Sequence, residues 1–219
     1  MFKGMKVTME IRQIMRQLKE LFPDDVLDQY PLPSPWCENR DTVRAILLGC
    51  DPSNSHCRHL PYVFALGADI PRFNAFKKAF EKDLLAVGLS WETVYVQNLC
   101  RNYFLKETSK NKKVWYEAAK YWIPVLREEL RKFRLDIPVL LTSDVLFDVL
   151  VRNPEQYEAT IDFYECRQPI PVRAEDNLLE RPLIPFYRGK NGRTKQSYRM
   201  ASGNWNEYRK RVEELCKST

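Results

Sequence analysis

The chain has 219 residues, a hydrophobic fraction of 44% and a formal net charge of +6. This length and composition suit one globular domain and exclude a disordered chain. No apolar run approaches the roughly 20 residues of a membrane-spanning helix, and the N-terminus lacks the pattern of a secretory signal peptide. We therefore expect one cytoplasmic domain over residues 1–219, in which residues 1–40 form an N-terminal helix and a proline-rich lead-in.

The first elements expected are a helix, an extended segment and a buried strand. Apolar residues at helical spacing predict an amphipathic helix that follows Thr8, a candidate N-cap, and ends near Pro23. Three alternating prolines between residues 31 and 35 then favour an extended surface segment. Four apolar residues at Ala45–Leu48, closed by Gly49, are typical of a strand covered on both faces.

The middle of the chain predicts helix, strand and helix in turn. Pro71 opens a helix that Gly88 closes. One face of it carries Phe73, Phe76, Phe80 and Leu84, which we interpret as core residues and not as ligand-binding residues. A second strand follows at Thr93–Asn98, and a long helix spans Val114–Phe133.

The last third predicts two more strands. Pro138–Leu141 is a buried strand, and Ser143 caps the short helix after it. Residues 153–179 give no clear pattern, and Arg181–Tyr187 is the fourth strand. A final helix begins after Ser202 or Asn204. This alternation predicts an α/β fold with a central four-stranded parallel sheet and helices on both faces.

The positive charge is concentrated at the end of the chain. Residues 187–219 contain nine Lys or Arg and three Asp or Glu, whereas the first 186 residues contain 26 of each sign. A basic segment on a neutral body indicates a polyanionic partner, because phosphate backbones release counterions when cations bind them. A solubilising helix is the alternative explanation for the charges near residue 210.

The six cysteines do not suggest a disulfide framework or a metal site. None belongs to a C-x-x-C pair, so free thiols in a reducing compartment are expected. Both histidines, His56 and His59, lie near Cys50 and Cys57, but their spacing fits no standard zinc pattern. We therefore predict no metal and no cofactor.

Three polar or aromatic residues occupy informative positions near strand ends. Asp51 follows the first strand, Phe64 comes thirteen residues later, and Asn98 closes the second strand. A carboxylate can orient water, an aromatic ring can stack on a flat polar ring, and an amide can read the edge of that ring. With GCDP, VF, VQN and a late IPFYR in this order, the chain from Val43 to Leu215 resembles the uracil-DNA glycosylase superfamily.

The resemblance implies a monofunctional DNA glycosylase that hydrolyses the N-glycosidic bond of a flipped uracil or other damaged base in DNA. Asp51 would be catalytic, while Cys50, Phe64 and Asn98 would contact the base. The proline segment, represented by Pro33 and Ser34, would contact the DNA backbone. Some members of the superfamily carry an iron–sulfur cluster, but this chain lacks the close cysteine pair that such clusters usually use. We expect a monomer that binds DNA and no membrane.

The chain departs from the superfamily pattern at the fourth strand. Members of the superfamily have a His there, whereas this chain has Tyr187 and Arg188 and no His after His59. Either residue could stabilise the departing base, Arg188 as a cation or Tyr187 as a hydroxyl donor. The basic loop that follows supplies further expected DNA contacts, namely Lys190, Arg193, Lys195 and Arg199.

The residues that follow Asp51 also leave the choice of base open. Superfamily members that exclude thymine place an aromatic residue after the D-P pair, where this chain has Ser53 and Asn54. Two other functions are consistent with the sequence. One is a nucleic-acid-binding protein of the same fold without catalytic activity. The other is a hydrolase that uses Cys50 as its nucleophile with His56 or His59 as the base.

Overall fold

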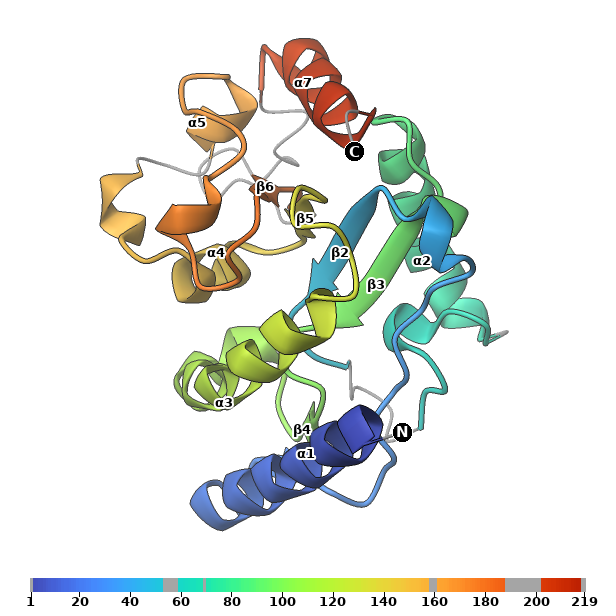
Figure 1. The fold of residues 1–219 in the computed structure, drawn as a ribbon, viewed down its shortest axis with the longest axis vertical. Coiled ribbons are helices and arrows are strands. Elements are labelled where there is room, and N and C mark those ends of the chain that lie inside the picture. Colours follow the sequence, from blue (N-terminus) through green and yellow to red (C-terminus); the bar gives the residue numbers. More distant parts are fainter. Residues whose placement is uncertain (1, 53–58, 69, 158–160, 188–201, 218–219) are drawn as a thin grey trace.

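A computed structural model describes residues 2–52, 59–68, 70–157, 161–187 and 202–217. At its centre lies a four-stranded, all-parallel sheet with the strand order β3-β2-β5-β6 (Figure 1). The strands are β2 (Ala45–Gly49), β3 (Val94–Asn98), β5 (Val139–Leu141) and β6 (Leu183–Pro185). All four predicted strands are therefore confirmed, and with them an α/β fold with a parallel sheet.

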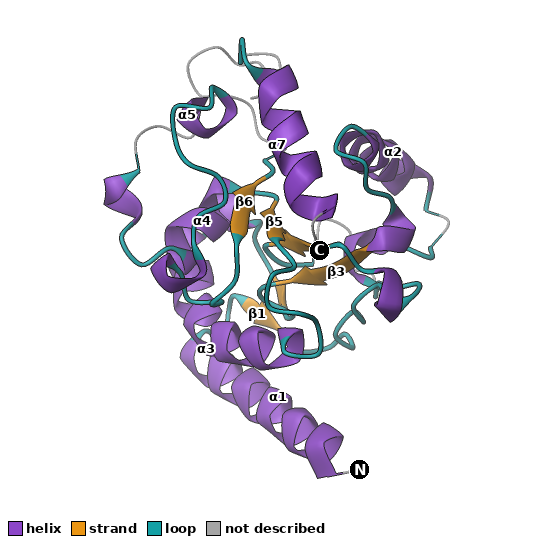
Figure 2. Ribbon diagram, turned by 45° about the horizontal axis from the view of Figure 1, so that its top comes forward, coloured by secondary structure: helices purple, strands orange, loops and turns teal. Residues whose placement is uncertain are grey.

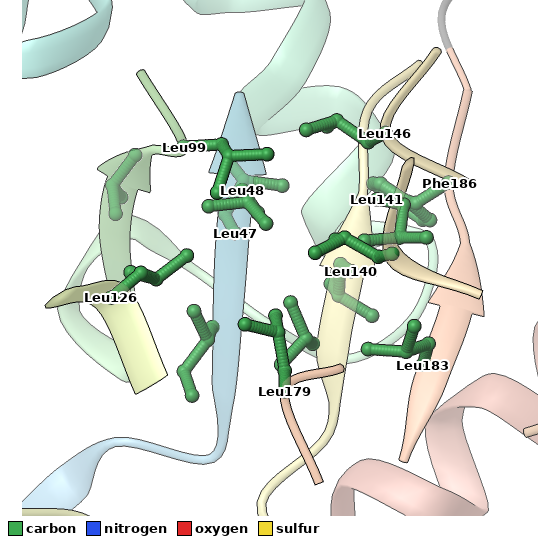
Figure 3. Close-up of a cluster of buried hydrophobic side chains, with 14 of the residues drawn as sticks. Leu47, Leu48, Leu99, Leu126, Leu140, Leu141, Leu146, Leu179, Leu183 and Phe186 are labelled. Carbon is green, nitrogen blue, oxygen red and sulfur yellow. The ribbon is translucent and has the colours of Figure 1, made fainter. Parts of the chain in front are cut away.

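The sheet is buried on both faces, as continuous apolar strands require. Every residue of the four strands is buried. Figure 3 shows how leucines from neighbouring strands pack against residues from the connecting segments, such as Leu99 and Leu146. Because this packing fixes the strands, the residues at their carboxyl ends have well-defined positions.

Helices cover both faces of the sheet because the chain changes direction across it. Helix α2 (Pro71–Leu85) connects β2 to β3, which lies at one edge. Helices α3 (Lys112–Leu130) and α4 (Asp144–Leu150) belong to crossovers that run towards the other edge. Right-handed crossovers in opposite directions place their helices on opposite faces, and Figures 1 and 2 show α2 on one side with α3 and α4 on the other.

The N-terminal helix begins earlier than predicted, and a short strand that was not predicted follows it. Helix α1 (Phe2–Leu21) begins six residues before Thr8, so Thr8 lies inside the helix and does not cap it. After α1, strand β1 (Val26–Leu27) pairs antiparallel with β4 (Tyr103–Phe104). Each of these strands has only two residues, too few for a periodic pattern to appear in the sequence.

The C-terminal part packs around a group of aromatic residues. Helix α5 (Ile161–Tyr164) lies in the stretch 153–179 that the sequence did not resolve, and it contacts helix α7 (Trp205–Lys217). Asn204 directly precedes α7, and its carbonyl accepts the N–H groups of Glu207 and Tyr208 in that helix.

The predicted cap of α4 is confirmed, since the Ser143 hydroxyl accepts the N–H of Val145. No helix in the described ranges is both long and apolar enough to span a membrane.

Candidate active site

The ends of β2 and β3 bring the predicted residues to one edge of the sheet. In the parallel register Gly49 lies opposite Asn98. The pairing continues past the strands, because the N–H of Cys100 donates to the carbonyl of Cys50 at 2.9 Å. Asp51 is the next residue along the chain. The carboxyl ends of parallel strands are the usual ligand-binding edge of an open α/β sheet, so Asp51 and Asn98 occupy that edge together.

A cavity of about 280 Å³ lies beside these strand ends. Its lining residues are Gly49, Cys50, Asp51, Pro52, Leu60, Phe64, Ala65, Phe73, Phe76, Phe80, Asn98 and Thr142. We call it the base cavity, and it contains the predicted residues Asp51, Cys50, Phe64 and Asn98. Pockets for drug-sized ligands begin at about 300 Å³, so this volume suits a single small ring system.

Gly49 is the residue that allows this cavity to form. A Cβ atom at position 49 would lie 2.4 Å from Oδ1 of Asn98 and 2.8 Å from two ring carbons of Phe64. Both distances are too short for non-bonded atoms. Glycine is therefore required here because the amide and the aromatic ring both approach the end of β2 closely.

Phe64 has a strained backbone. Its φ of 58° and ψ of 16° lie in the left-handed region, and Ala65 follows with a φ of 54°. This conformation is uncommon for a residue with a side chain and is found preferentially at ligand-binding sites. The Phe64 ring packs against Phe76 and Phe80, with ring centres 5.7 Å and 5.2 Å away. The strain places one face of an aromatic ring on the cavity wall.

The aromatic face of α2 has a role that the sequence did not reveal. Phe73, Phe76 and Phe80 were predicted to belong to the core, yet all three line the base cavity. The core prediction is confirmed for Leu84 and Phe80, which are buried in the core, although Phe80 also contributes to the cavity wall. Helical spacing identifies the inward face of a helix, but it cannot distinguish a packed core from the wall of a cavity.

Asn98 lines the cavity and carries a buried donor without a partner among the described residues. The residue is 3% exposed, and the donor is its Nδ2 group. The backbone N–H of Asn98 donates to Oε1 of Gln97 at 2.9 Å, which fixes the end of β3. A buried donor without a partner costs about 1–3 kcal/mol. A carbonyl oxygen of a bound ring would remove that cost.

Asp51 is a partly buried carboxyl group with an altered proton affinity. The pKa of Asp51 is raised from 3.8 to about 7, mainly by burial and to a smaller extent by the nearby charge of Glu107. The Thr108 hydroxyl donates to Oδ1 of Asp51, which opposes this rise in pKa. The indole N–H of Trp115 also lowers the pKa, although it lies outside normal hydrogen-bond geometry. Asp51 is thus about half ionised at neutral pH, as suits a group that must handle water and protons.

Cys50 is unsuited to act as a nucleophile. Burial and the adjacent charge of Asp51 raise the pKa of its thiol to about 12. A thiol with this pKa carries almost no thiolate at neutral pH, and the thiolate is the reactive form. Of the two histidines proposed as its base, His59 is exposed, and His56 lies outside the described residues. The geometry therefore supports Cys50 only as part of the cavity wall.

Tyr187 does not lie at the base cavity. It is buried at 6% exposure, and its N–H donates to the Tyr164 hydroxyl at 2.6 Å. The two rings pack together beside Trp205 of α7. The predicted role of Tyr187 as a donor to the departing base is not consistent with this position. Arg188 and the predicted DNA contacts Lys190, Arg193, Lys195 and Arg199 lie outside the described residues.

The proline segment is hydrogen-bonded to the turn that carries Phe64. Pro33 is buried and Ser34 is exposed, so a direct contact of Pro33 with DNA is not consistent with the structure. The carbonyl of Ser34 accepts the N–H of Val63, and the N–H of Ser34 donates to the carbonyl of Pro61, both at 2.9 Å. These two bonds hold the turn that carries Phe64, which is a structural role for this segment.

Within the described ranges, no group of three or more His, Cys, Asp or Glu side chains is arranged to hold a metal ion.

Thr108 was not predicted as a site residue, although it reaches Asp51 from a loop 57 residues further along the chain. No family model matches the chain, and no curated protein matches it either. The resemblance to the uracil-DNA glycosylase superfamily thus remains a prediction based on short motifs.

Proposed function

We propose that the protein hydrolyses the N-glycosidic bond of a flipped uracil or other damaged base in DNA. The observation that carries this proposal is the composition of the base cavity. The described lining of this small cavity combines aromatic rings, among them that of Phe64, with the amide of Asn98 and the carboxyl group of Asp51. This combination matches the needs of a flat heterocycle that is held while its bond to a sugar breaks.

Each of the three residues has a separate task in the proposed reaction. The Phe64 ring stacks on the base, a contact worth about 1–3 kcal/mol in comparable complexes. The Nδ2 group of Asn98 donates to a carbonyl oxygen of the base. This hydrogen bond becomes stronger as negative charge develops on the departing base. Ionised Asp51 stabilises the positive charge that develops on the sugar and orients the attacking water.

The overall step is a hydrolysis. The water oxygen forms a bond to the sugar carbon while the carbon–nitrogen bond breaks, and the electron pair of that bond leaves with the base. The attacking water loses one proton and the base nitrogen takes up one, so that the products are a sugar hydroxyl and the free base. No lysine occurs among the described residues that line the base cavity, which favours water over an amine as the nucleophile.

One observation favours the alternative, a nucleic-acid-binding protein without catalysis. Among the described residues the base cavity has no cationic lining residue, and Tyr187 packs against Tyr164 of α5 instead of lining the cavity. Stabilisation of the departing base by a fixed cation thus depends on Arg188, which lies outside the described residues. A protein without that stabilisation would hold a flipped base and leave the glycosidic bond intact.

The experiment that separates these functions measures base release. Oligonucleotides that carry uracil, hypoxanthine, xanthine or an alkylated base are incubated with the protein, and abasic sites are then cleaved with alkali. Strand scission on one substrate, lost in Asp51→Asn and retained in the exposed control Asp24→Asn, is the expected result. Binding to these oligonucleotides without scission of any of them would establish the alternative instead.

A further inference from the structure

Asp51 and Cys50 separate the base cavity from a second, larger cleft. This cleft has a volume of about 780 Å³. Its wall consists of the segment 104–110, Lys112, and residues 143–145 at the start of α4. Figure 1 shows β4, which leads into that segment, on the side towards which the arrows of β2 and β3 point. Both spaces thus border on Cys50 and Asp51.

The loop that forms most of this wall is held in place at both ends by one residue. The N–H of Leu105 donates to the carbonyl of Asp25 at 2.8 Å. Nδ2 of Asn111 donates to the carboxylate of the same Asp25 at 2.7 Å. Between these ends, the Thr108 hydroxyl donates to Asp51. We call this arrangement the Asp25 clasp. It gives the loop a fixed shape before any ligand binds, which lowers the entropic cost of binding.

The loop presents cations that are available for a ligand. Lys106 and Lys112 are exposed, and neither forms an ion pair with a carboxylate in the described part of the chain. Lys110 pairs with Glu107 at 3.6 Å, but both side chains are more than half exposed, so this pair is weak.

A further acid on the wall, Asp144, is engaged with its own helix. Oδ1 of Asp144 accepts the N–H of Val145 at 2.9 Å and the hydroxyl of Ser143 at 3.1 Å. Its negative charge is thus partly satisfied by the start of α4. The described lining thus carries three lysines and three carboxyl groups. Each carboxyl group has a polar partner, whereas Lys106 and Lys112 have no carboxylate at ion-pair distance among the described residues.

The start of α3 places positive charge where a helix least favours it. Lys112 and Lys113 are the first two residues of this 19-residue helix, and its first turn contains no acidic residue. The partial positive charge at a helix N-terminus favours anions and disfavours cations. This local conflict occurs on the wall of a cleft next to Asp51. An anion bound there would satisfy the lysine and the helix end together.

We propose that this cleft binds the phosphodiester backbone of a DNA strand immediately next to the flipped nucleotide, with Lys106 and Lys112 as the contacting cations. The inference rests on the proposed function for the position of the base. A base in the base cavity leaves its sugar beside Asp51, and the backbone attached to that sugar continues into the cleft. The substrate class is then a polynucleotide strand, not a free nucleoside.

The test measures the affinity for single-stranded DNA directly. A fluorescein-labelled oligonucleotide of about twelve unmodified nucleotides is titrated with the wild type, with the double variant Lys106→Ala/Lys112→Ala, and with Lys120→Ala. The control Lys120 is an exposed lysine of the same helix that pairs with Glu117 and lines neither cavity. We expect about tenfold weaker binding for the double variant and unchanged binding for Lys120→Ala. The slope of log affinity against log salt should fall by about 1.4, since each phosphate contact on a single strand contributes about 0.7.

Thermal unfolding provides the second readout. The double variant loses one exposed loop charge and one charge that opposes the dipole of α3, so its melting temperature should be close to that of the wild type. Weaker binding by an equally stable variant cannot result from unfolding. Equal affinity and equal salt slope in the double variant and the wild type would overturn the proposal. So would a mononucleotide that binds as tightly as the oligonucleotide with the same dependence on the lysines.

The outcomes also separate this inference from the proposed function. The binding test uses unmodified DNA and needs no catalysis. Absence of base release together with lysine-dependent binding would refute only the glycosylase activity. Base release together with lysine-independent binding would refute only the role of the cleft.

Discussion

Replacement of Asp51 by asparagine should make the protein more stable at high pH and not at low pH. The folded state raises the pKa of Asp51 from 3.8 to about 7 because the carboxyl group is buried. One pKa unit corresponds to about 1.36 kcal/mol, so the ionised form costs the fold about 4 kcal/mol. Because the folded pKa is raised, the wild type is most stable when Asp51 is protonated and loses stability as the pH rises towards 7.

The variant carries no charge at position 51 and keeps an oxygen that can accept the Thr108 hydroxyl. Its added N–H group can cost about 1–3 kcal/mol, but that cost does not depend on pH. The informative quantity is therefore the change with pH. Between about pH 4.5 and pH 8, the free energy of unfolding of the variant relative to the wild type should rise by about 3 kcal/mol.

Urea denaturation followed by circular dichroism at several pH values measures this quantity. Asp24→Asn, which alters an exposed carboxylate, serves as the matched control and should show no comparable rise. If the difference between Asp51→Asn and the wild type were the same at both ends of this pH range, Asp51 would not be a buried carboxyl group with a raised pKa. The reasoning about its catalytic role would then lose its physical basis.

Three further outcomes follow from the geometry of the base cavity. If Asp51 acts in its ionised form, kcat/KM for base release should be strongly reduced at pH 5, rise with a midpoint near pH 7 and level off above it. A value of kcat/KM that does not change between pH 5 and pH 8 would exclude this role. Gly49→Ala should abolish base release and lower stability by about 1–3 kcal/mol, since its Cβ would lie 2.4 Å from Asn98 Oδ1; normal activity of a folded variant would show that this close approach is unnecessary. Phe64→Ala should lower kcat/KM by roughly 5- to 150-fold through the loss of stacking, as measured on the preferred substrate, and an unchanged value would place the base elsewhere.

The sequence predicted the sheet well because each strand carries its own local signal. Ala45–Gly49 and Val94–Asn98 are short apolar runs with recognisable ends, and both are strands in the structure. The two-residue strands β1 and β4 depend on each other for their hydrogen bonds and leave no such signal. The described helical segments of the region 153–179 have three or four residues each, too few to show a periodic pattern in the sequence.

The candidate site was predictable only where a residue stands next to a strand. Asp51 and Asn98 were found because each lies at or just past the end of a strand. Thr108 and Phe76 reach the site from a loop and from the side of a helix, and these positions depend on tertiary packing. Tyr187 shows the opposite error. It lies two residues past β6, but its side chain packs with Tyr164, because proximity in sequence to a strand end does not fix the direction of a side chain.

The Asp25 clasp links the N-terminal segment to the cooperative unfolding of the site. Asp25 lies four residues past the end of α1, and its N–H donates to the carbonyl of Phe22 at 3.1 Å. The residues that shape the wall of the large cleft are therefore secured from the first 25 residues of the chain. Regions joined in this way usually open as one unit. Amide hydrogens in the clasp, such as that of Leu105, should then exchange with solvent at the rate at which α1 unfolds. Shortening α1 should therefore loosen the site, although this helix does not line it.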